Sequence, residues 1–174
     1  VRVLYLSMHC LKHHVSAASG FALTETHVVT SRHVLTSFVT NGLGLTVMTR
    51  DGRVLSVKTV TAMDRDNDLA LLDVPGARLP PLPLAPPPAP GAPVAVLSHP
   101  NDHFYVFTTG VASRQSVTKR QGRSVRFLGI TAEFARGSSG APVFDENGNV
   151  VGIVNETESI YYSEEGSRQE NLQM

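Results

Sequence analysis

"RGSSGAPVFDENGNVVGIV", residues 136–154, places two serines between glycines and then continues into two short apolar runs separated by a polar turn. Gly and Ser are ordinary turn residues. The stretch alone therefore fits either a plain turn before a hairpin or a turn that presents a nucleophile. Ser139 has the Gly-x-Ser-Gly frame that favours a nucleophile, and Ser138 lacks it. The remainder of the chain decides between these interpretations.

Short apolar runs rich in Val, Leu and Thr recur along the whole chain, with Gly, Pro or Asp-Gly between them. Such runs, spaced by about ten residues, are typical of an all-β sandwich or barrel. Hairpin turns are expected at Asp51-Gly52 and at Asn147-Gly148. The predicted strands are residues 2–8, 20–24, 27–31, 44–49, 54–60, 69–74, 93–99, 105–113, 124–130, 141–145 and 150–156.

The proline-rich stretch "LPPLPLAPPPAPGAP", residues 79–93, contains eight of the eleven prolines of the chain. Because proline cannot donate to a strand ladder, we expect an extended connector here. The connector divides the chain into residues 1–78 and 94–174, each with enough strands for a small barrel. We therefore expect two barrels that together form one domain.

Composition restricts the partners. Lys plus Arg and Asp plus Glu both number 15, so the formal net charge is zero, and no basic block is present. Nucleic acid is therefore not an expected partner. No apolar stretch approaches the roughly 20 residues that cross a bilayer, so membrane insertion is not expected.

The single Cys10 cannot form an internal disulfide. No signal-peptide pattern is visible, and we expect the chain to be part of a longer protein with further domains.

Three segments carry the residues of a nucleophilic site. His33 follows a β run in "HVVTSRHVL", Asp68 precedes the apolar "LALL", and Ser139 lies in the glycine turn. A serine hydroxyl is a weak nucleophile, so an imidazole must accept its proton and a carboxylate must orient the imidazole. These three residues are the predicted catalytic set. Asp64 and Asp66 are alternatives to Asp68. We favour Asp68 because it directly precedes the predicted apolar strand.

The same chemistry needs two convergent backbone N–H donors for the tetrahedral oxyanion. We assign these donors to Gly137 and Ser139, because glycine at positions 137 and 140 lets a substrate carbonyl approach the turn closely. No cofactor is required.

Two groups of histidines have other interpretations. The segment "HCLKHH", residues 9–14, offers three histidines and a cysteine as metal ligands, but its spacing does not match a full four-ligand site. We interpret it as a loop or strand end near the first barrel and predict no metal. His99 and His103 flank a proline turn, and we interpret them as loop-packing residues, with a role near substrate as the alternative.

The segments together resemble the trypsin-like serine proteases, closest to the disulfide-free bacterial branch of HtrA type. "SGFALTETHVVTSRHVL", "NDLALL" and "RGSSGAPVFDENGNVVGIV" carry the resemblance, which covers nearly the whole chain. "HPNDHFY", residues 99–105, and the tail with "YYSEE" and "ENLQM" are similar to bacterial trypsin-like peptidase domains. The resemblance implies an all-β fold of two packed six-stranded antiparallel barrels, with His33 and Asp68 on the first barrel and Ser139 on the second.

The implied activity is that of a serine endopeptidase that cleaves proteins or peptides through an acyl-enzyme. The alternative is a catalytically silent trypsin-fold domain that binds proteins, since a fold does not by itself determine function. Ser138 stands where digestive trypsins carry Asp, so activation by N-terminal cleavage is not expected. An exported or periplasmic location and a cytoplasmic one both remain open.

The resemblance also points to residues for specificity. Glu133 lies at the position that resembles the floor of the primary pocket in trypsin. A buried, unpaired carboxylate is costly, which favours a cationic ligand and hence a basic residue at P1, the substrate position before the cleaved bond. Val154, Asn155 and Glu156 resemble the edge strand that hydrogen-bonds the substrate backbone.

Overall fold

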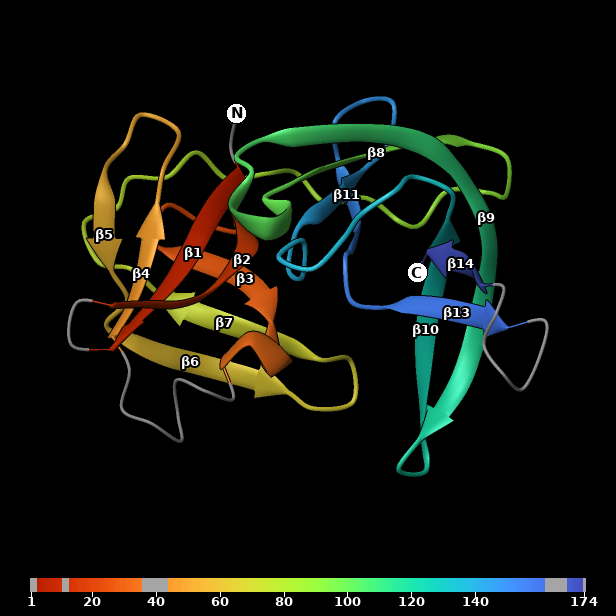
Figure 1. The fold of residues 1–174 in the computed structure, drawn as a ribbon, viewed down its shortest axis with the longest axis horizontal. Helices are drawn as coiled ribbons and strands as arrows, with labels where there is room; N and C mark the ends of the chain where they lie inside the picture. The colour runs from red at the N-terminus through yellow and green to blue at the C-terminus, as the bar shows by residue number, and fades with distance from the viewer. Residues whose placement is uncertain (1–2, 11–12, 36–43, 162–168, 174) are drawn as a thin grey trace.

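The structure is a computed structural model that describes residues 3–10, 13–35, 44–161 and 169–173. For residues 8–10, 13–16, 157–161 and 169–173 it describes only the backbone path. The side chains of "HCLKHH" therefore lie outside the described residues. Two curled antiparallel sheets lie side by side, one from each half of the chain (Figure 1).

The first sheet has the strand order β5-β4-β1-β2-β3-β7-β6. Its strands are β1 (Val3–Cys10), β2 (His13–Ala22), β3 (His27–Ser31), β4 (Gly44–Met48), β5 (Val54–Ser56), β6 (Thr59–Asp64) and β7 (Leu69–Asp73). A short 3₁₀ helix, η1 (Arg32–Leu35), follows β3.

The first sheet closes on itself through the segment predicted as one strand, residues 54–60. The structure divides it into β5 and β6, which lie at opposite ends of the strand order. The N–H of Val57 donates to Leu45 O on β4 at 3.0 Å, and the next N–H, of Lys58, donates to Asp73 O on β7 at 2.9 Å. Because consecutive residues bond both edges, the sheet curls into a barrel. Counted as one bent strand, β5 and β6 give the expected six.

The second sheet has the strand order β12-β11-β8-β9-β10-β14-β13. Its strands are β8 (Pro93–Ser98), β9 (Val106–Arg120), β10 (Arg123–Ile130), β11 (Pro142–Phe144), β12 (Val150–Ile153), β13 (Thr157–Tyr161) and β14 (Gln169–Gln173), with a 3₁₀ turn, η2 (Pro100–Asp102), after β8. Here β12 and β13 are near neighbours in sequence and lie at opposite ends of the strand order, so this sheet curls as well. The predicted all-β fold class is confirmed.

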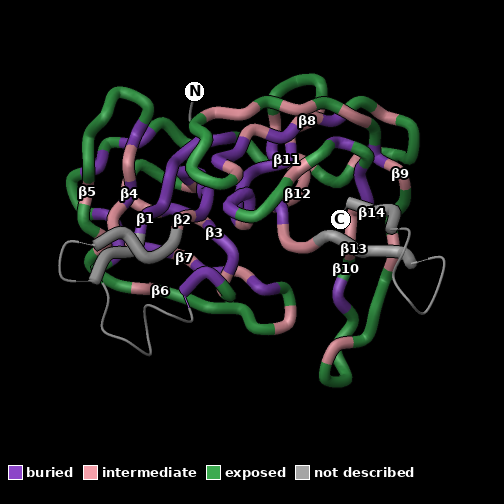
Figure 2. Tube along the Cα trace, in the orientation of Figure 1, coloured by how far each residue is buried: buried purple, intermediate pink, exposed green. Residues whose placement is uncertain are grey.

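Each sheet encloses its own apolar core, as the buried stretches in Figure 2 show. Burial alternates along β3, β7 and β8, as expected for strands with one face turned inward. Leu6, Val28 and Leu72 are among the fully buried residues of the first core. Val96 and Ile130 are among those of the second.

The proline-rich connector is fixed to both sheets. The N–H of Leu82 donates to Ala22 O at 3.0 Å in the first barrel, and that of Ala85 donates to Val150 O at 2.9 Å in the second. Leu82 also packs with Phe21 and Val150 in a small cluster that joins the barrels. Because proline has no N–H, these few non-proline residues supply the donors. No helix in the described part of the chain is long and apolar enough to cross a membrane.

Candidate active site

The end of β3 and the start of β7 lie side by side, because Ser31 pairs with Leu69 in the antiparallel ladder. Arg32 follows Ser31, and its N–H donates to Asp68 O at 2.8 Å. His33 is the next residue, and its N–H donates to Asp68 Oδ1 at 2.9 Å. Strand pairing within one barrel therefore places the imidazole against the carboxylate.

The Asp68 carboxylate is directed at the imidazole of His33. Asp68 is 8% exposed, and its left-handed backbone, with φ of 54°, turns the chain from an exposed loop into β7. The second carboxylate oxygen, Oδ2, lies 2.5 Å from His33 Nδ1. A carboxylate only accepts hydrogen bonds, so Nδ1 carries the proton and Nε2 of the neutral ring is an acceptor.

The other two acidic residues of this turn, Asp64 and Asp66, have partners other than His33. The Asp64 carboxylate accepts hydrogen bonds from the Asn67 side chain at 2.7 Å and from the Asn67 and Asp66 backbone N–H groups. These bonds, led by the Asn67 side chain, lower the pKa of Asp64 below its ordinary value. Asp66 lies 3.2 Å from Arg123 on the second barrel. Of the three acids, Asp68 is the one that meets His33.

Ser139 completes the hydrogen-bonded series. Its Oγ lies 3.0 Å from His33 Nε2, so three residues far apart in the sequence form one chain of contacts between the barrels. Ser138 has a different environment. It is fully buried, and its Oγ lies 2.9 Å from Ser98 Oγ. The structure thus brings the predicted His33, Asp68 and Ser139 together and directs Ser138 into the second barrel.

The turn around Ser139 is held through its carbonyl groups. The carbonyl of Arg136 accepts a hydrogen bond from Asn101 N–H at 2.8 Å, and that of Ser138 accepts one from Ala141 N–H at 2.9 Å. Ser19 holds the other two carbonyls: its Oγ donates to Gly137 O at 3.0 Å, and its N–H donates to Ser139 O at 2.9 Å. Within the described residues, the turn donates from the N–H groups of Ser138, Gly140 and Ala141, but those of Gly137 and Ser139 have no protein acceptor. In a trans peptide the N–H points opposite to the C=O. These two N–H groups therefore face away from the donors that hold the turn.

Both glycines of the turn have left-handed backbone and tight surroundings. Gly137 has φ of 97° and Gly140 has φ of 86°. A Cβ at position 137 would lie 2.7 Å from His99 O, and one at position 140 would clash with Ser19 O and Thr30 Oγ1. From the sequence, we predicted that these glycines let a substrate carbonyl approach the turn closely. The structure adds that they let the first barrel and the loop of residues 99–105 contact the turn.

This loop of residues 99–105 supports the turn from one side. His99 is fully buried, and burial lowers its pKa to about 4, so its ring is neutral near pH 7. Its Nδ1 accepts the N–H of Tyr105 at 3.1 Å. Tyr5 on β1 donates to Asp102 Oδ1 at 3.0 Å, and its ring forms a T-shaped contact with the ring of His99. The interpretation of His99 as a packing residue agrees with these contacts, while His103 is exposed.

Comparison with protein families places this sequence in a known group. The family described as "Trypsin-like peptidase domain" matches residues 18–153, which is most of the chain. The chain belongs to the trypsin-like peptidase domain family.

Two curated relatives are each 31% identical to this trypsin-like peptidase domain. One is the uncharacterized protein y4bJ of Sinorhizobium fredii, over 155 residues that cover 80% of this chain and 22% of that protein. The other is the serine protease Rv3671c of Mycobacterium tuberculosis, over 164 residues that cover 88% of this chain and 39% of that protein. The chain thus spans well under half the length of both. Family membership and the second relative support a protease.

Solved structures agree with the fold. The crystal structure of Deg5 has a TM-score of 0.73 and 24% identity, and the match covers 89% of this chain and 79% of that one. The active form of the Rv3671c protease has a TM-score of 0.75 and 24% identity, with 99% of this chain and 75% of that one covered. At this identity the likeness establishes the fold, a trypsin-like pair of barrels.

The expectation that Glu133 is buried is wrong for this trypsin-like peptidase domain. Glu133 is exposed, and its backbone carbonyl accepts a hydrogen bond from Thr108 Oγ1 at 2.7 Å. The direction of its side chain depends on the path of residues 131–136, which local sequence does not reveal. The cost of an unpaired buried carboxylate therefore supplies no argument for a cationic ligand at this residue.

Val154 also differs from the expectation that it binds the substrate backbone. It is buried, its N–H donates to Ala141 O at 2.8 Å, and its carbonyl accepts from Gly140 N–H at 2.9 Å and from Ser31 Oγ at 3.2 Å. Both backbone groups are thus already bonded within the protein. Val154 instead ties the turn of Ser139 to both barrels.

Asn155 and Glu156 are partly exposed and link β12 to β13 outside either strand. Glu156 accepts a hydrogen bond from the Arg120 side chain at 2.8 Å. Their backbone groups, unlike those of Val154, remain candidates for contact with an extended substrate.

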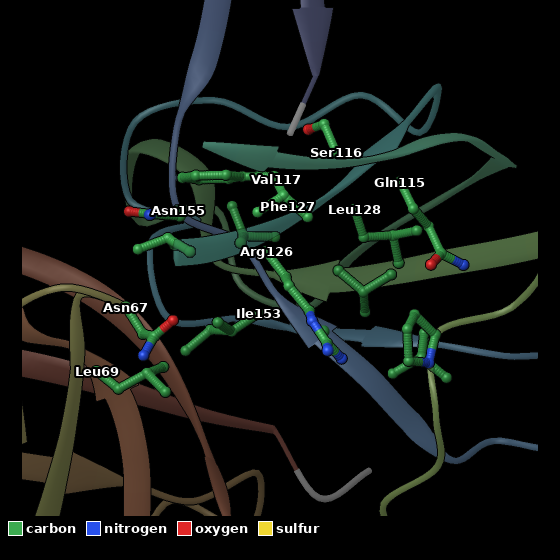
Figure 3. Close-up of a pocket in the computed structure, with 16 residues that line it drawn as sticks. Asn67, Leu69, Gln115, Ser116, Val117, Arg126, Phe127, Leu128, Ile153 and Asn155 are labelled. Carbon is green, nitrogen blue, oxygen red and sulfur yellow. The ribbon is translucent and has the colours of Figure 1, made fainter. Parts of the chain in front are cut away.

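A groove of about 420 Å³ lies between the second barrel and the turn that carries Asp68. Asn67 and Leu69, which flank Asp68, line one side, and Ile153 and Arg126 line the other (Figure 3). Most of the other lining residues lie on β9 to β12, and most of these are apolar. His33, Asp68 and Ser139 are not among the lining residues. The groove therefore adjoins the neighbours of Asp68 in the chain and not the contact series itself.

Proposed function

We propose that this chain is a serine endopeptidase that hydrolyses peptide bonds through an acyl-enzyme. The observation that carries the proposal is the series of contacts from Asp68 Oδ2 to His33 Nδ1 at 2.5 Å and from His33 Nε2 to Ser139 Oγ at 3.0 Å. Family membership supports the same function class.

In the first half-reaction, Ser139 Oγ attacks the substrate carbonyl carbon while its proton passes to His33 Nε2. Asp68 keeps the proton on Nδ1 and stabilises the imidazolium that forms. The carbonyl oxygen becomes negative, and the unengaged N–H groups of Gly137 and Ser139 are the donors for it. The imidazolium then returns its proton to the leaving amine, the C–N bond breaks, and the acyl group stays on Ser139.

In the second half-reaction, water takes the place of the amine. His33 accepts a proton from the water as its oxygen attacks the acyl carbon, and then returns that proton to Ser139 Oγ. The exposure of His33 and Asp68 supports this sequence, because the Asp68 side chain is 11% exposed while the His33 side chain is 46% exposed. Solvent and substrate can reach the imidazole, and the orienting carboxylate is kept from water.

A fluorophosphonate probe tests the nucleophile. In the wild-type chain Ser139 Oγ is expected to form the bond to phosphorus as fluoride leaves, and mass spectrometry of peptides is expected to locate the label there. Ser139→Ala is expected to lose the label, and Ser138→Ala is expected to keep it on Ser139, because the Ser138 hydroxyl is buried against Ser98. A folded wild-type chain without label would favour the silent binding domain, and label on Ser138 would contradict the assignment.

Extended protein or peptide segments are the proposed substrates, with main-chain contacts to Asn155 and Glu156. A basic P1 preference through Glu133 is the finer part of the proposal. Because that carboxylate is exposed, its attraction for Arg or Lys is screened by water and is expected to be worth at most about 1 kcal/mol.

Glu133→Gln is therefore expected to lower the ratio of kcat/KM for Arg over Leu at P1 by no more than about fivefold. Matched peptides that differ only at P1 provide the measurement. Cleavage by the wild-type chain mainly after Leu or Val would rule out the basic preference. A loss near 100-fold would show that substrate buries the carboxylate after all.

A further inference from the structure

Ser19 on β2 is a fully buried serine that contacts three separate parts of the chain. Its Oγ meets Gly137 O and the N–H of His99, each at 3.0 Å. Its backbone N–H donates to Ser139 O at 2.9 Å. Its own carbonyl accepts a hydrogen bond from Thr30 Oγ1 at 2.8 Å, which fixes it within the first barrel.

The direction of the Ser19 hydroxyl follows from its two partners. The His99 N–H is a donor and has to be accepted, while the Gly137 carbonyl is an acceptor and has to receive a proton. Ser19 Oγ therefore accepts from His99 and donates to Gly137. One hydroxyl with one proton satisfies both groups, and both His99 and Gly137 are buried.

The two carbonyls that Ser19 holds belong to the peptide units on either side of the unit that contains the N–H of Ser139. A trans peptide is planar, so fixing a carbonyl fixes the plane of its unit. The unit that joins residues 137 and 138 and the unit that joins residues 139 and 140 are thereby set from the first barrel. They flank the unit that contains the N–H of Ser139, so their planes limit the direction of this N–H relative to that of Gly137.

We propose that Ser19 is a positioning residue that holds the turn of residues 136–139 so that the N–H groups of Gly137 and Ser139 converge on one oxyanion. The proposal rests on the proposed endopeptidase function. Ser19 acts through the turn and does not touch the reacting atoms. Without its hydroxyl, the Gly137 carbonyl and the His99 N–H lose their partner in a buried place, and the turn relaxes to recover hydrogen bonds.

Ser19→Ala tests this role, with Ser31→Ala as a matched control. Ser31 is also fully buried in the first barrel, and its hydroxyl also donates across to the second barrel, but to Val154 O and not to the turn carbonyls. Ser19→Ala is expected to lower kcat about 10- to 100-fold with KM within about threefold of the wild type, because only the transition state bears the oxyanion. Ser31→Ala is expected to keep kcat within about threefold.

A peptide aldehyde gives a second readout, since it forms a tetrahedral adduct with the serine. Ser19→Ala is expected to weaken aldehyde binding by the same factor as kcat, while the affinity for the matching product peptide stays unchanged. Should Ser19→Ala fail to fold, Ser19→Cys, which keeps a weak donor, takes its place and must show the same separation of kcat from KM.

The outcomes distinguish failure of the proposed role of Ser19 from failure of the proposed endopeptidase function. A folded wild-type chain with neither turnover nor label would overturn the endopeptidase function, and this inference with it. An active wild-type chain whose kcat and aldehyde affinity are unchanged in Ser19→Ala would overturn the inference alone. An equal loss of kcat in Ser31→Ala would also overturn it, because the effect would then come from the joining of the barrels in general.

Discussion

Replacement of His33 by alanine is expected to lower kcat by about 10⁴-fold or more. His33 is the group within 3.0 Å of Ser139 Oγ that can accept its proton. Without it, the hydroxyl attacks as a neutral, weak nucleophile, and no acid protonates the leaving amine. Steady-state cleavage of a peptide by the wild-type and His33→Ala chains, at equal folded concentration by circular dichroism, provides the measurement.

His27→Ala is the control for this loss. His27 is the first residue of β3, while His33 follows the last residue of that strand, so the two histidines lie at opposite ends of it. The His27 ring Nδ1 lies 3.0 Å from Thr24 Oγ1, in the turn before the strand. Its removal is expected to change kcat by less than about threefold, since it touches none of the three proposed catalytic side chains. Peptidase activity that survives in His33→Ala would contradict the proposed mechanism, because the reaction would then proceed without His33 as its base.

The meeting of His33, Asp68 and Ser139 was predictable because each residue stands beside a strong local signal. Asp68 precedes an apolar run that becomes β7, and His33 follows one that becomes β3. Ser139 lies in a turn whose glycines have to adopt left-handed backbone. Local patterns of this kind locate strand ends, and the antiparallel pairing of β3 with β7 then brings the first two together.

The contacts that hold the turn were not predictable, because they join residues far apart in sequence. Ser19 and Gly137 are 118 positions apart, and nothing in the local composition around either one indicates the other. The exposure of Glu133 depends in the same way on the path of a loop. The division of residues 54–60 into two strands follows from barrel closure, which is a property of the whole sheet and not of that run.

The hairpin turns show the same limit on a smaller scale. Asp51-Gly52 and Asn147-Gly148 were found from their residue types, and both glycines have positive φ. The turn between β9 and β10 uses Gln121 and Gly122, with φ of 49° and 82°. Gln is not a usual residue for left-handed backbone. Here the pairing of two long strands imposes the turn on a residue that does not favour it.

Replacement of Gly140 by alanine is expected to destabilise the domain by about 2–5 kcal/mol. About 1–2 kcal/mol comes from placing a Cβ on left-handed backbone, with φ of 86°. A further 1–3 kcal/mol, roughly, comes from overpacking, because the new Cβ clashes with Ser19 O and Thr30 Oγ1 and lies 3.0 Å from the backbone N of Ser31. Urea unfolding at an unchanged m-value measures the difference.

Gly148→Ala separates these two contributions. Gly148 has φ of 79° in a turn of the same barrel, and no atom lies within 4 Å of the position of its Cβ. It is expected to lose only the backbone part, about 1–2 kcal/mol, and to keep kcat, while Gly140→Ala also loses kcat because the clash moves Ser139 away from His33. Equal destabilisation of the two variants would mean that the first barrel does not press on the turn. The support that Ser19 gives to the oxyanion donors would then lack its structural basis, because that support requires the same close approach.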